Sequence, residues 1–503
     1  MAFGQRLAGG FIGLALIGAA STALAQYVPD SAPAPGAAPA ATINPAAIPL
    51  PADIPVPAGV SNGQALPRGG AYSPGAPAAA PAAAPLPKVA ARPKAKRKLA
   101  APSPLETALP TDPTPTLTPD TAAFTARAAE RYAAIAAAGG WPTIAGPLGP
   151  RSKGPEVSVL RRRLAIEGDL DRSAADGLDS LAWDASLTAG VRRFQSRVGL
   201  RPTGVVAGAT LSALNVPASV RAEELAASAR RLADLNFSFG DRYVVVNLPS
   251  ASVEAVENGQ VVRRFAAIVG GVDHPSPQLA AHVAAIDLNP TWTVPVSIIK
   301  NEIMPRMQRD PGYLARERIR VLDGTGAEID PRRIDWTSER AANYTLRQDS
   351  GAGNSLGSIR INMPNKEAVY MHDTPSKRLF GADYRFLSHG CVRVQGVYDL
   401  AAWLLEGTDG APLGVWDKNE LLAEIATGQR ETLKVARQTP VIWVYLTGWA
   451  NSDGAANFRN DVYGLDAAVD ATAAGEPQID SPSPGAPLPL AQILRFPPAA
   501  AAR

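Results

Sequence analysis

Apolar residues recur every three or four positions over several stretches in the first half of the chain, and this spacing predicts amphipathic helices. The stretch from Thr121 to Gly139 is alanine-rich and shows this helical spacing. Further helical runs, separated by polar loops, lie between residues 149 and 217. Their apolar positions are Val157, Leu160, Leu164, Ile166, Leu187, Val191, Phe194, Leu211 and Leu214. We therefore expect a short helical segment over 121–148 and a small helical module over 149–217.

A further helical run extends from about Ala218 to Leu235, and β-branched runs typical of strands follow it. Residues 242–247 read Arg-Tyr-Val-Val-Val-Asn, which is typical of a strand. The next stretch, 252–271, reads as a hairpin in which Asn258 and Gly259 supply the positive φ angles of a tight turn. These features predict a sheet-containing domain over residues 218–470.

The pattern changes to polar helix and loop between residues 297 and 344, and strand character returns at 345–348. We therefore expect a helical insertion between strands of the sheet. Farther on, apolar residues recur at helical spacing from Val397 to Leu405, until Gly407 ends the run.

Composition separates the two ends of the chain from this folded part. Residues 26–120 and 471–503 are rich in alanine and proline, and the whole chain holds 47 prolines. Such segments cannot bury enough apolar surface to offset chain entropy, so we expect a disordered tether and a disordered tail. A basic group interrupts the tether, and it is either solubilising charge or a weak attraction for anionic envelope polymers or lipid surfaces. Its members are Lys88, Arg92, Lys94, Lys96, Arg97 and Lys98.

Residues 1–25 have the form of a secretory signal, with a basic start at Arg6, an apolar run over 11–20 and small residues at 23–25. We therefore expect export to the periplasm or cell envelope, and no stable membrane span after cleavage. An uncleaved anchor is the alternative, although the apolar run is short for a span.

Net charge is only +3, which gives no case for nucleic-acid binding. The chain holds four histidines and one cysteine, too few in clusters for a metal site. We expect no metal and no cofactor.

The single cysteine, Cys391, lies in a polar Ser-His-Gly-Cys sequence that is neither continued helix nor apolar strand. A thiol becomes a useful nucleophile when a base or a positive field raises its thiolate fraction, and His372 follows a strand-like run upstream. His389 and Gly390 directly precede Cys391, and a glycine there lets backbone N–H groups turn toward one point, as an oxyanion hole requires. The helical run from Val397 predicts that the thiol lies just ahead of a helix N-terminus, which favours the thiolate.

These residues carry a family resemblance. His-Asp-Thr-Pro-Ser-Lys-x-Leu-Phe from His372, followed by Arg-x-x-Ser-His-Gly-Cys-Val-Arg from Arg385, resembles the signature of the L,D-transpeptidases, which cross-link or remodel peptidoglycan. The similarity is to the large periplasmic, YcbB-like subgroup. It implies Cys391 as nucleophile and His372 as its base, oriented by a backbone carbonyl rather than by Asp373.

The resemblance also implies the surroundings of the reaction. Ser388, His389 and Gly390 are expected to support the oxyanion. The residues implied in substrate binding are Tyr370, Arg393, Trp292, Asn354 and Arg385.

Two other regions resemble parts of known envelope proteins. The module over 149–217 is similar to a small three-helix peptidoglycan-binding module, which either binds the wall or is architectural. The insertion over 297–344 is similar to the substrate-capping subdomain of the YcbB-like group. Together these imply a multidomain α+β protein with a mostly-β catalytic domain.

The function implied is formation of 3-3 cross-links through a cysteinyl thioester on a tetrapeptide donor stem, with release of D-alanine. Stem peptides and carbapenem-type inhibitors are the expected partners. The same thioester also serves an L,D-carboxypeptidase, a cross-link hydrolase or a lipoprotein-anchoring enzyme. A non-catalytic wall-binding protein is the third alternative.

Overall fold

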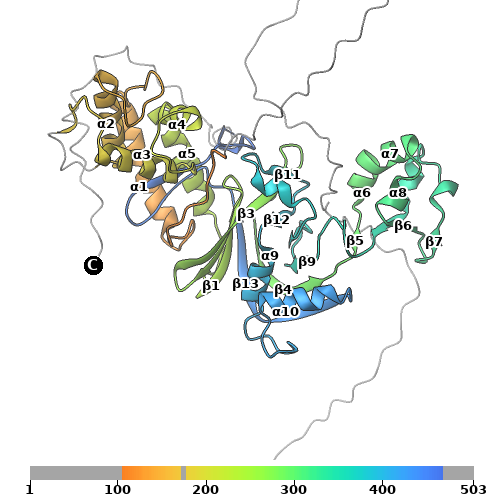
Figure 1. Ribbon diagram of the computed structural model, residues 1–503. Coiled ribbons are helices and arrows are strands. Elements are labelled where there is room, and N and C mark those ends of the chain that lie inside the picture. The colour runs from red at the N-terminus through yellow and green to blue at the C-terminus, as the bar shows by residue number, and fades with distance from the viewer. Residues whose placement is uncertain (1–104, 171–176, 468–503) are drawn as a thin grey trace, which may run out of the picture. The chain divides into compact units, whose positions relative to one another are not determined.

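The computed structural model describes residues 105–170 and 177–467 (Figure 1). The predicted signal, most of the predicted tether and the predicted tail therefore lie outside the described residues. Among the helices that are described, none is long and apolar enough to cross a membrane.

The N-terminal part of the fold is helical, as the apolar spacing predicts. Its core is formed by the predicted positions, including Leu160, Leu164, Leu187, Val191 and Phe194, which are fully or almost fully buried. The module thus has three helices, and a longer helix flanks it on each side in sequence. The helices are α1 (Thr121–Ala137), α2 (Pro155–Glu167), α3 (Ala185–Arg197), α4 (Gly208–Leu214) and α5 (Ala218–Ala233).

The second part of the fold is mostly β, in a sheet ordered β11-β3-β12-β10-β9-β4-β13-β1-β2. β3 also pairs with β2, so the strand order closes on itself. The predicted hairpin is present, because Asn258 and Gly259 both take positive φ between β2 and β3. The strands are β1 (Arg242–Asn247), β2 (Ser252–Glu257), β3 (Gln260–Gly270), β4 (Leu279–Leu288), β9 (Ile359–Asn362), β10 (Met371–His372), β11 (Phe386–Ser388), β12 (Val392–Val394) and β13 (Glu431–Val444).

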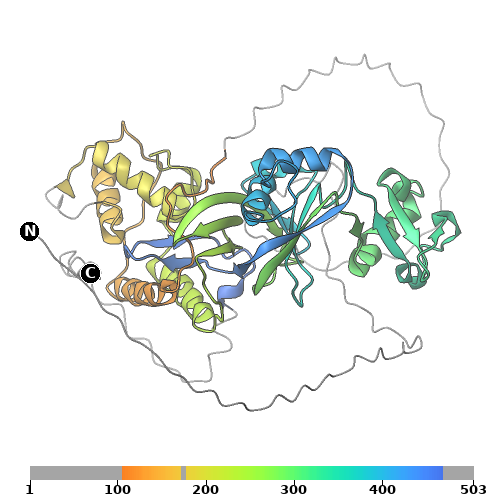
Figure 2. The same ribbon diagram turned by 90° about the horizontal axis from the view of Figure 1, so that it is seen from below.

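The insertion contains strands as well as helices, which corrects the expectation of a helical insertion. Its β6 and β7 join β5 and β8 in a second sheet, ordered β5-β8-β6-β7 (Figures 1 and 2). In β6 the half-buried Arg320 lies between the buried Ile319 and Val321, but Leu322 is buried as well, and four residues are a weak signal in a sequence. The elements are β5 (Trp292–Thr293), α6 (Val296–Ile298), η2 (Ile299–Ile303), α7 (Met304–Arg309), α8 (Tyr313–Arg316), β6 (Ile319–Leu322), β7 (Glu328–Ile329), η3 (Pro331–Arg333), η4 (Glu339–Asn343) and β8 (Thr345–Gln348).

A strand separates Cys391 from the helix that follows it, contrary to the expectation that the thiol lies just ahead of a helix N-terminus. Val392–Val394 forms β12, and α9 begins only at Val397. The reason is the β-branched sequence Val-Arg-Val, which pairs on both sides within the sheet. The remaining elements are η5 (Lys377–Gly381), α9 (Val397–Leu404), α10 (Lys418–Ala426), β14 (Gly448–Ala450) and β15 (Ala456–Phe458).

Residues 105–118, which we expected to belong to the tether, are held against the folded part. The guanidinium of Arg264 donates hydrogen bonds to the carbonyls of Pro110, Asp112 and Thr114. The buried carboxylate of Glu254 accepts from the backbone N–H and the hydroxyl of Thr116 and from Arg264 Nε. Composition alone missed this segment because the contacts that hold it against the folded part are with residues distant in sequence.

Replacing Glu254 with alanine should lower the free energy of unfolding by about 3–5 kcal/mol, because it leaves Arg264 charged, buried and unpaired. Denaturant unfolding measures the change. Asp399→Ala is the matched control, since the Asp399–Lys418 pair is largely exposed and should be worth about 0–1 kcal/mol. Equal effects of the two substitutions would mean that the 105–118 segment adds nothing to the stability of the folded part.

Candidate active site

Two short parallel strands bring the predicted nucleophile and base together. β10 pairs with β12 so that Met371 lies opposite Val392 and His372 opposite Arg393, and Val392 N–H donates to the carbonyl of Tyr370. Side chains alternate along a strand, so Tyr370, His372, Cys391 and Arg393 occupy one face and Met371 and Val392 the other. The sequence-predicted pair is thus placed on one surface by backbone register.

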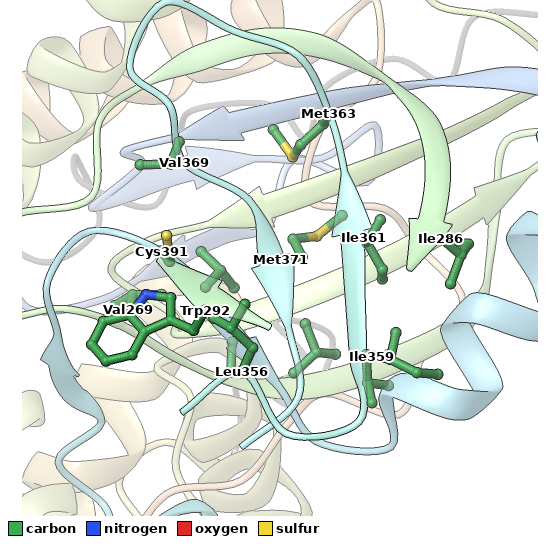
Figure 3. Close-up of a cluster of buried hydrophobic side chains, with 14 of the residues drawn as sticks. Val269, Ile286, Trp292, Leu356, Ile359, Ile361, Met363, Val369, Met371 and Cys391 are labelled. Carbon is green, nitrogen blue, oxygen red and sulfur yellow. The ribbon is translucent and has the colours of Figure 1, made fainter. Parts of the chain in front are cut away.

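The Cys391 thiol lies at the edge of a cluster of buried apolar side chains (Figure 3). Trp292, on β5, lies beside it in this view, and Met371 and Ile361 belong to the same cluster. Both Cys391 and Trp292 are almost fully buried. The thiol therefore sits in apolar surroundings, with an indole as its neighbour.

The loop that carries Cys391 is fixed by two serines. Ser388 Oγ donates to the carbonyl of Cys391 and accepts from Gly390 N–H at 3.2 Å. Ser276 Oγ donates to the Gly390 carbonyl at 2.7 Å. Gly390 has a φ of 109°, which favours glycine. Its N–H, expected in the oxyanion hole, is thus engaged by Ser388 at rest.

Burial dominates the ionisation of the thiol. It raises the pKa of Cys391 to about 12, although the backbone and hydroxyl of Tyr370 and the charges of Arg393 and Arg360 act to lower it. At neutral pH the resting thiol is therefore protonated. The expectation of a raised thiolate fraction is wrong for the resting site, because desolvation outweighs the positive field.

Burial also keeps the base neutral. It lowers the pKa of His372 to about 3, helped by Arg393 and opposed by backbone groups of Asp373 and Leu356. Neither ring nitrogen of His372 has a side-chain partner among the described residues, so only backbone groups act on the ring as hydrogen-bond partners. A neutral imidazole is suited to accept a proton.

Asp373 is committed elsewhere. Its carboxylate is buried, pairs with Lys377, and accepts from Ser358 N–H, Ser358 Oγ and Tyr398 Oη. The side chain therefore holds the strand end in place. These contacts fit the expectation that Asp373 is not the acid of a triad.

Tyr370 contacts Arg360, which is paired with Asp287, and sequence reasoning missed both residues. Its ring meets that of His372 edge to face, with centroids 5.7 Å apart, and the Arg360 guanidinium lies 5.3 Å from its centroid. Arg360 is held by a 2.8 Å ion pair to Asp287, which also accepts from Asn362 and Thr432. Arg360 lies opposite both Asp287 and His372 in the sheet register, and no local motif reveals that arrangement.

The remaining predicted binding residues divide into two groups. Arg393 and Trp292 lie at the site, and burial lowers the pKa of Arg393 to about 10. Asn354 instead donates to the Asp349 carbonyl and accepts from Leu356 N–H, so its amide serves a turn.

Arg385 is also directed away from the thiol. Its guanidinium bonds the carbonyl of Ala382 and lines a cavity of about 380 Å³ whose walls include neither Cys391 nor His372. The contacts of Asn354 and Arg385 therefore do not support the expectation of substrate binding, since their polar groups serve other parts of the fold.

Two family models match the chain. The L,D-transpeptidase catalytic domain, YkuD, matches residues 241–415, and the "Putative peptidoglycan binding domain" matches residues 153–214. A curated protein of Haemophilus influenzae named "Putative L,D-transpeptidase" is 31% identical over 246 residues, which are 48% of this chain and 48% of that protein. The chain thus spans about half the length of this relative.

Solved structures of several L,D-transpeptidases are similar at low identity. The enzyme of Xylanimonas cellulosilytica is 17% identical, with 60% of this chain and 100% of that chain covered and a TM-score of 0.20. That of Stackebrandtia nassauensis is 12% identical, with 60% and 96% covered and a TM-score of 0.23. LdtMt1 in complex with imipenem is 17% identical, with 41% and 59% covered and a TM-score of 0.18.

Alkylation of Cys391 should rise about tenfold for each pH unit between pH 7 and 10 without a plateau, because the thiol titrates near 12. Intact-mass kinetics with iodoacetamide measure this directly, since Cys391 is the only cysteine. Restricted access lowers the rate at every pH and leaves the slope unchanged. A small free thiol is the control, and its alkylation rate should level off near pH 9. A plateau of Cys391 labelling near neutral pH would instead indicate a thiolate–imidazolium pair.

Proposed function

Because the chain contains an L,D-transpeptidase catalytic domain and a peptidoglycan-binding domain, we propose that it forms 3-3 cross-links in peptidoglycan through a thioester on Cys391. The donor is a tetrapeptide stem, and the leaving group is its terminal D-alanine. The acceptor is the side-chain amine of a second stem.

The steps follow from a protonated thiol beside a neutral imidazole. As Cys391 Sγ attacks the carbonyl carbon of the bond between an L-centre and a D-centre, the thiol proton passes to His372. When the tetrahedral intermediate collapses, His372 returns that proton to the departing amine of D-alanine, and the thioester remains. The acceptor amine then attacks the thioester, gives a proton to His372, and the thiol is restored.

The observation that carries the proposal is the buried, neutral imidazole of His372 on the same strand face as the Cys391 thiol. No side chain among the described residues pairs with either ring nitrogen, and the groups that act on the ring are the backbone of Asp373 and of Leu356. Such an arrangement is typical of a functional group rather than of packing. It favours acyl transfer over the alternative of a non-catalytic wall-binding protein, which has no use for a neutral imidazole on the same strand face as its only thiol.

The acceptor decides between the remaining alternatives. Water as acceptor gives a carboxypeptidase or a cross-link hydrolase, and a protein amine gives lipoprotein anchoring, all from the same thioester. The insertion over 297–344 supports a transferase, because a lid that excludes water protects the thioester until an amine arrives. Export and action in the periplasm or envelope are part of the proposal and rest on the sequence of residues 1–25.

Wild-type protein should gain one carbapenem adduct at Cys391 by intact mass, and Cys391→Ala should gain none. His372→Gln should slow acylation by about 10²–10⁴-fold, the usual contribution of a general base. His282→Gln is the matched control, because His282 is exposed on β4 and should leave the rate unchanged. An unchanged rate in His372→Gln would assign the base elsewhere.

Muropeptide products then identify the acceptor. With disaccharide tetrapeptides as substrate, mass spectrometry should find dimers that have lost one D-alanine per cross-link. Tripeptide monomers alone would identify a carboxypeptidase, while a Cys391 adduct with neither product would point to another acceptor.

A further inference from the structure

We propose that Glu302, on the insertion, is a positioning residue of the active site, which holds His389 and through it the loop that carries Cys391. The inference rests on the proposed function, because it concerns the same acyl-transfer site. It assigns the insertion a specific contact with the catalytic loop.

The contact is a short one between groups far apart in the sequence. Glu302 Oε1 lies 2.6 Å from His389 Nε2, and both side chains are mostly buried, with exposed fractions of 24% and 17%. A carboxylate acceptor makes this a charge-assisted hydrogen bond, which is among the stronger kinds. His389 is two residues before the nucleophile, so its position constrains the Cys391 backbone.

The other nitrogen of the ring has no anchor. His389 Nδ1 is buried and has no hydrogen-bond partner among the described residues. The polar hold on the ring therefore depends on Glu302. His274 packs flat against the ring, with centroids 4.4 Å apart and planes 19° apart, so stacking limits tilt but does not fix rotation within the plane.

The loop of His274 is itself tied to the catalytic loop. A Cβ at Gly270 would clash with the backbone of His274 and Ser276, so only glycine lets this loop return so closely. Ser276 then donates to the Gly390 carbonyl. His389 is thus held on its ring face by His274 and at its ring edge by Glu302, while Ser276 holds the next residue, Gly390.

The backbone around Glu302 is adapted to this contact. Residues 299–303 form a π-helical turn, in which Met304 N–H donates to the Ile299 carbonyl. The wider turn keeps Ile298 and Ile299 buried together with Ile303 and Met304, while Glu302 stays partly accessible at the surface of the insertion. Single π-helical turns are frequent at functional sites. The bulge therefore reconciles core packing with a carboxylate that faces His389.

If the Glu302–His389 pair had only a structural role, its loss would have a different effect. Partly exposed ion pairs contribute about 0–1 kcal/mol to stability, so losing this one should scarcely change unfolding. If the pair serves positioning, its loss should instead reduce the acylation rate at constant stability, with kcat affected more than KM.

The test compares Glu302→Ala, Glu302→Gln and the control Glu339→Gln. Glu339 is also an insertion carboxylate in an ion pair, but its partner is Lys300 within the insertion. We expect Glu302→Ala to reduce carbapenem acylation of Cys391 about tenfold. Glu302→Gln should recover most of the rate, because its amide oxygen still accepts from Nε2–H, and Glu339→Gln should match the wild type. Thermal unfolding of all three should match the wild type.

Two further measurements separate positioning from other effects. In a double-mutant cycle, Glu302→Ala should add no loss to His389→Ala, since the carboxylate acts through the ring. Hydrogen exchange of the backbone over 386–392 should be faster in Glu302→Ala than in Glu339→Gln, and this readout does not need enzymatic activity.

The proposal is overturned by unchanged exchange in Glu302→Ala, by additive losses in the cycle, or by equal acylation in Glu302→Ala and Glu339→Gln. Failure of the proposed function looks different. In that case the wild type forms no adduct, and the exchange comparison still decides whether Glu302 positions the loop.

Discussion

The site depends on one parallel pairing between two very short strands. β10 has two residues and β12 has three, yet their register places Tyr370, His372, Cys391 and Arg393 on a single face. Met371 and Val392, both fully buried, fasten the opposite face to the core. A slip by one residue would turn the thiol and the imidazole into that core and bring apolar side chains to the site. Register is therefore set by packing, and the chemistry is set by register.

That placement has an electrostatic consequence, because burial pushes acid and base toward their neutral forms. Because folding lowers the pKa of His372, the free energy of unfolding decreases as the pH falls. The imidazole takes up a proton below about pH 6.5 in the unfolded chain but only near pH 3 in the folded one. Because folding raises the pKa of Cys391, the free energy of unfolding decreases as the pH rises. The thiol ionises above about pH 9 in the unfolded chain but only near pH 12 in the folded one. Between these limits both groups stay neutral, so in the proposed mechanism the proton moves only when the sulfur attacks.

Sequence reasoning succeeded where the signal is local. The Asn258-Gly259 turn and the apolar spacing of the helical module each depend on neighbours within a few residues. It failed where the decisive partner is distant in sequence: Glu254 binds the 105–118 segment, and Arg360 reaches Tyr370 because strand register brings them together. The substrate-binding roles of Asn354 and Arg385 stay predictions, and a family position does not reveal that their polar atoms also serve other parts of the fold.

The insertion and the loop that carries Cys391 are in direct contact through Glu302 and His389. In the proposed mechanism the thioester on Cys391 is open to hydrolysis for as long as the acceptor is absent, so a transferase gains from any element that excludes water and orients the incoming amine. An insertion that merely covered the thiol would also exclude the stem peptide. One that contacts the loop at His389 can instead be coupled to it, because the Glu302 carboxylate pairs with the ring of His389, which lies two residues before the nucleophile. If Glu302 positions the loop as we propose, the geometry of the loop depends on whether the insertion is in place.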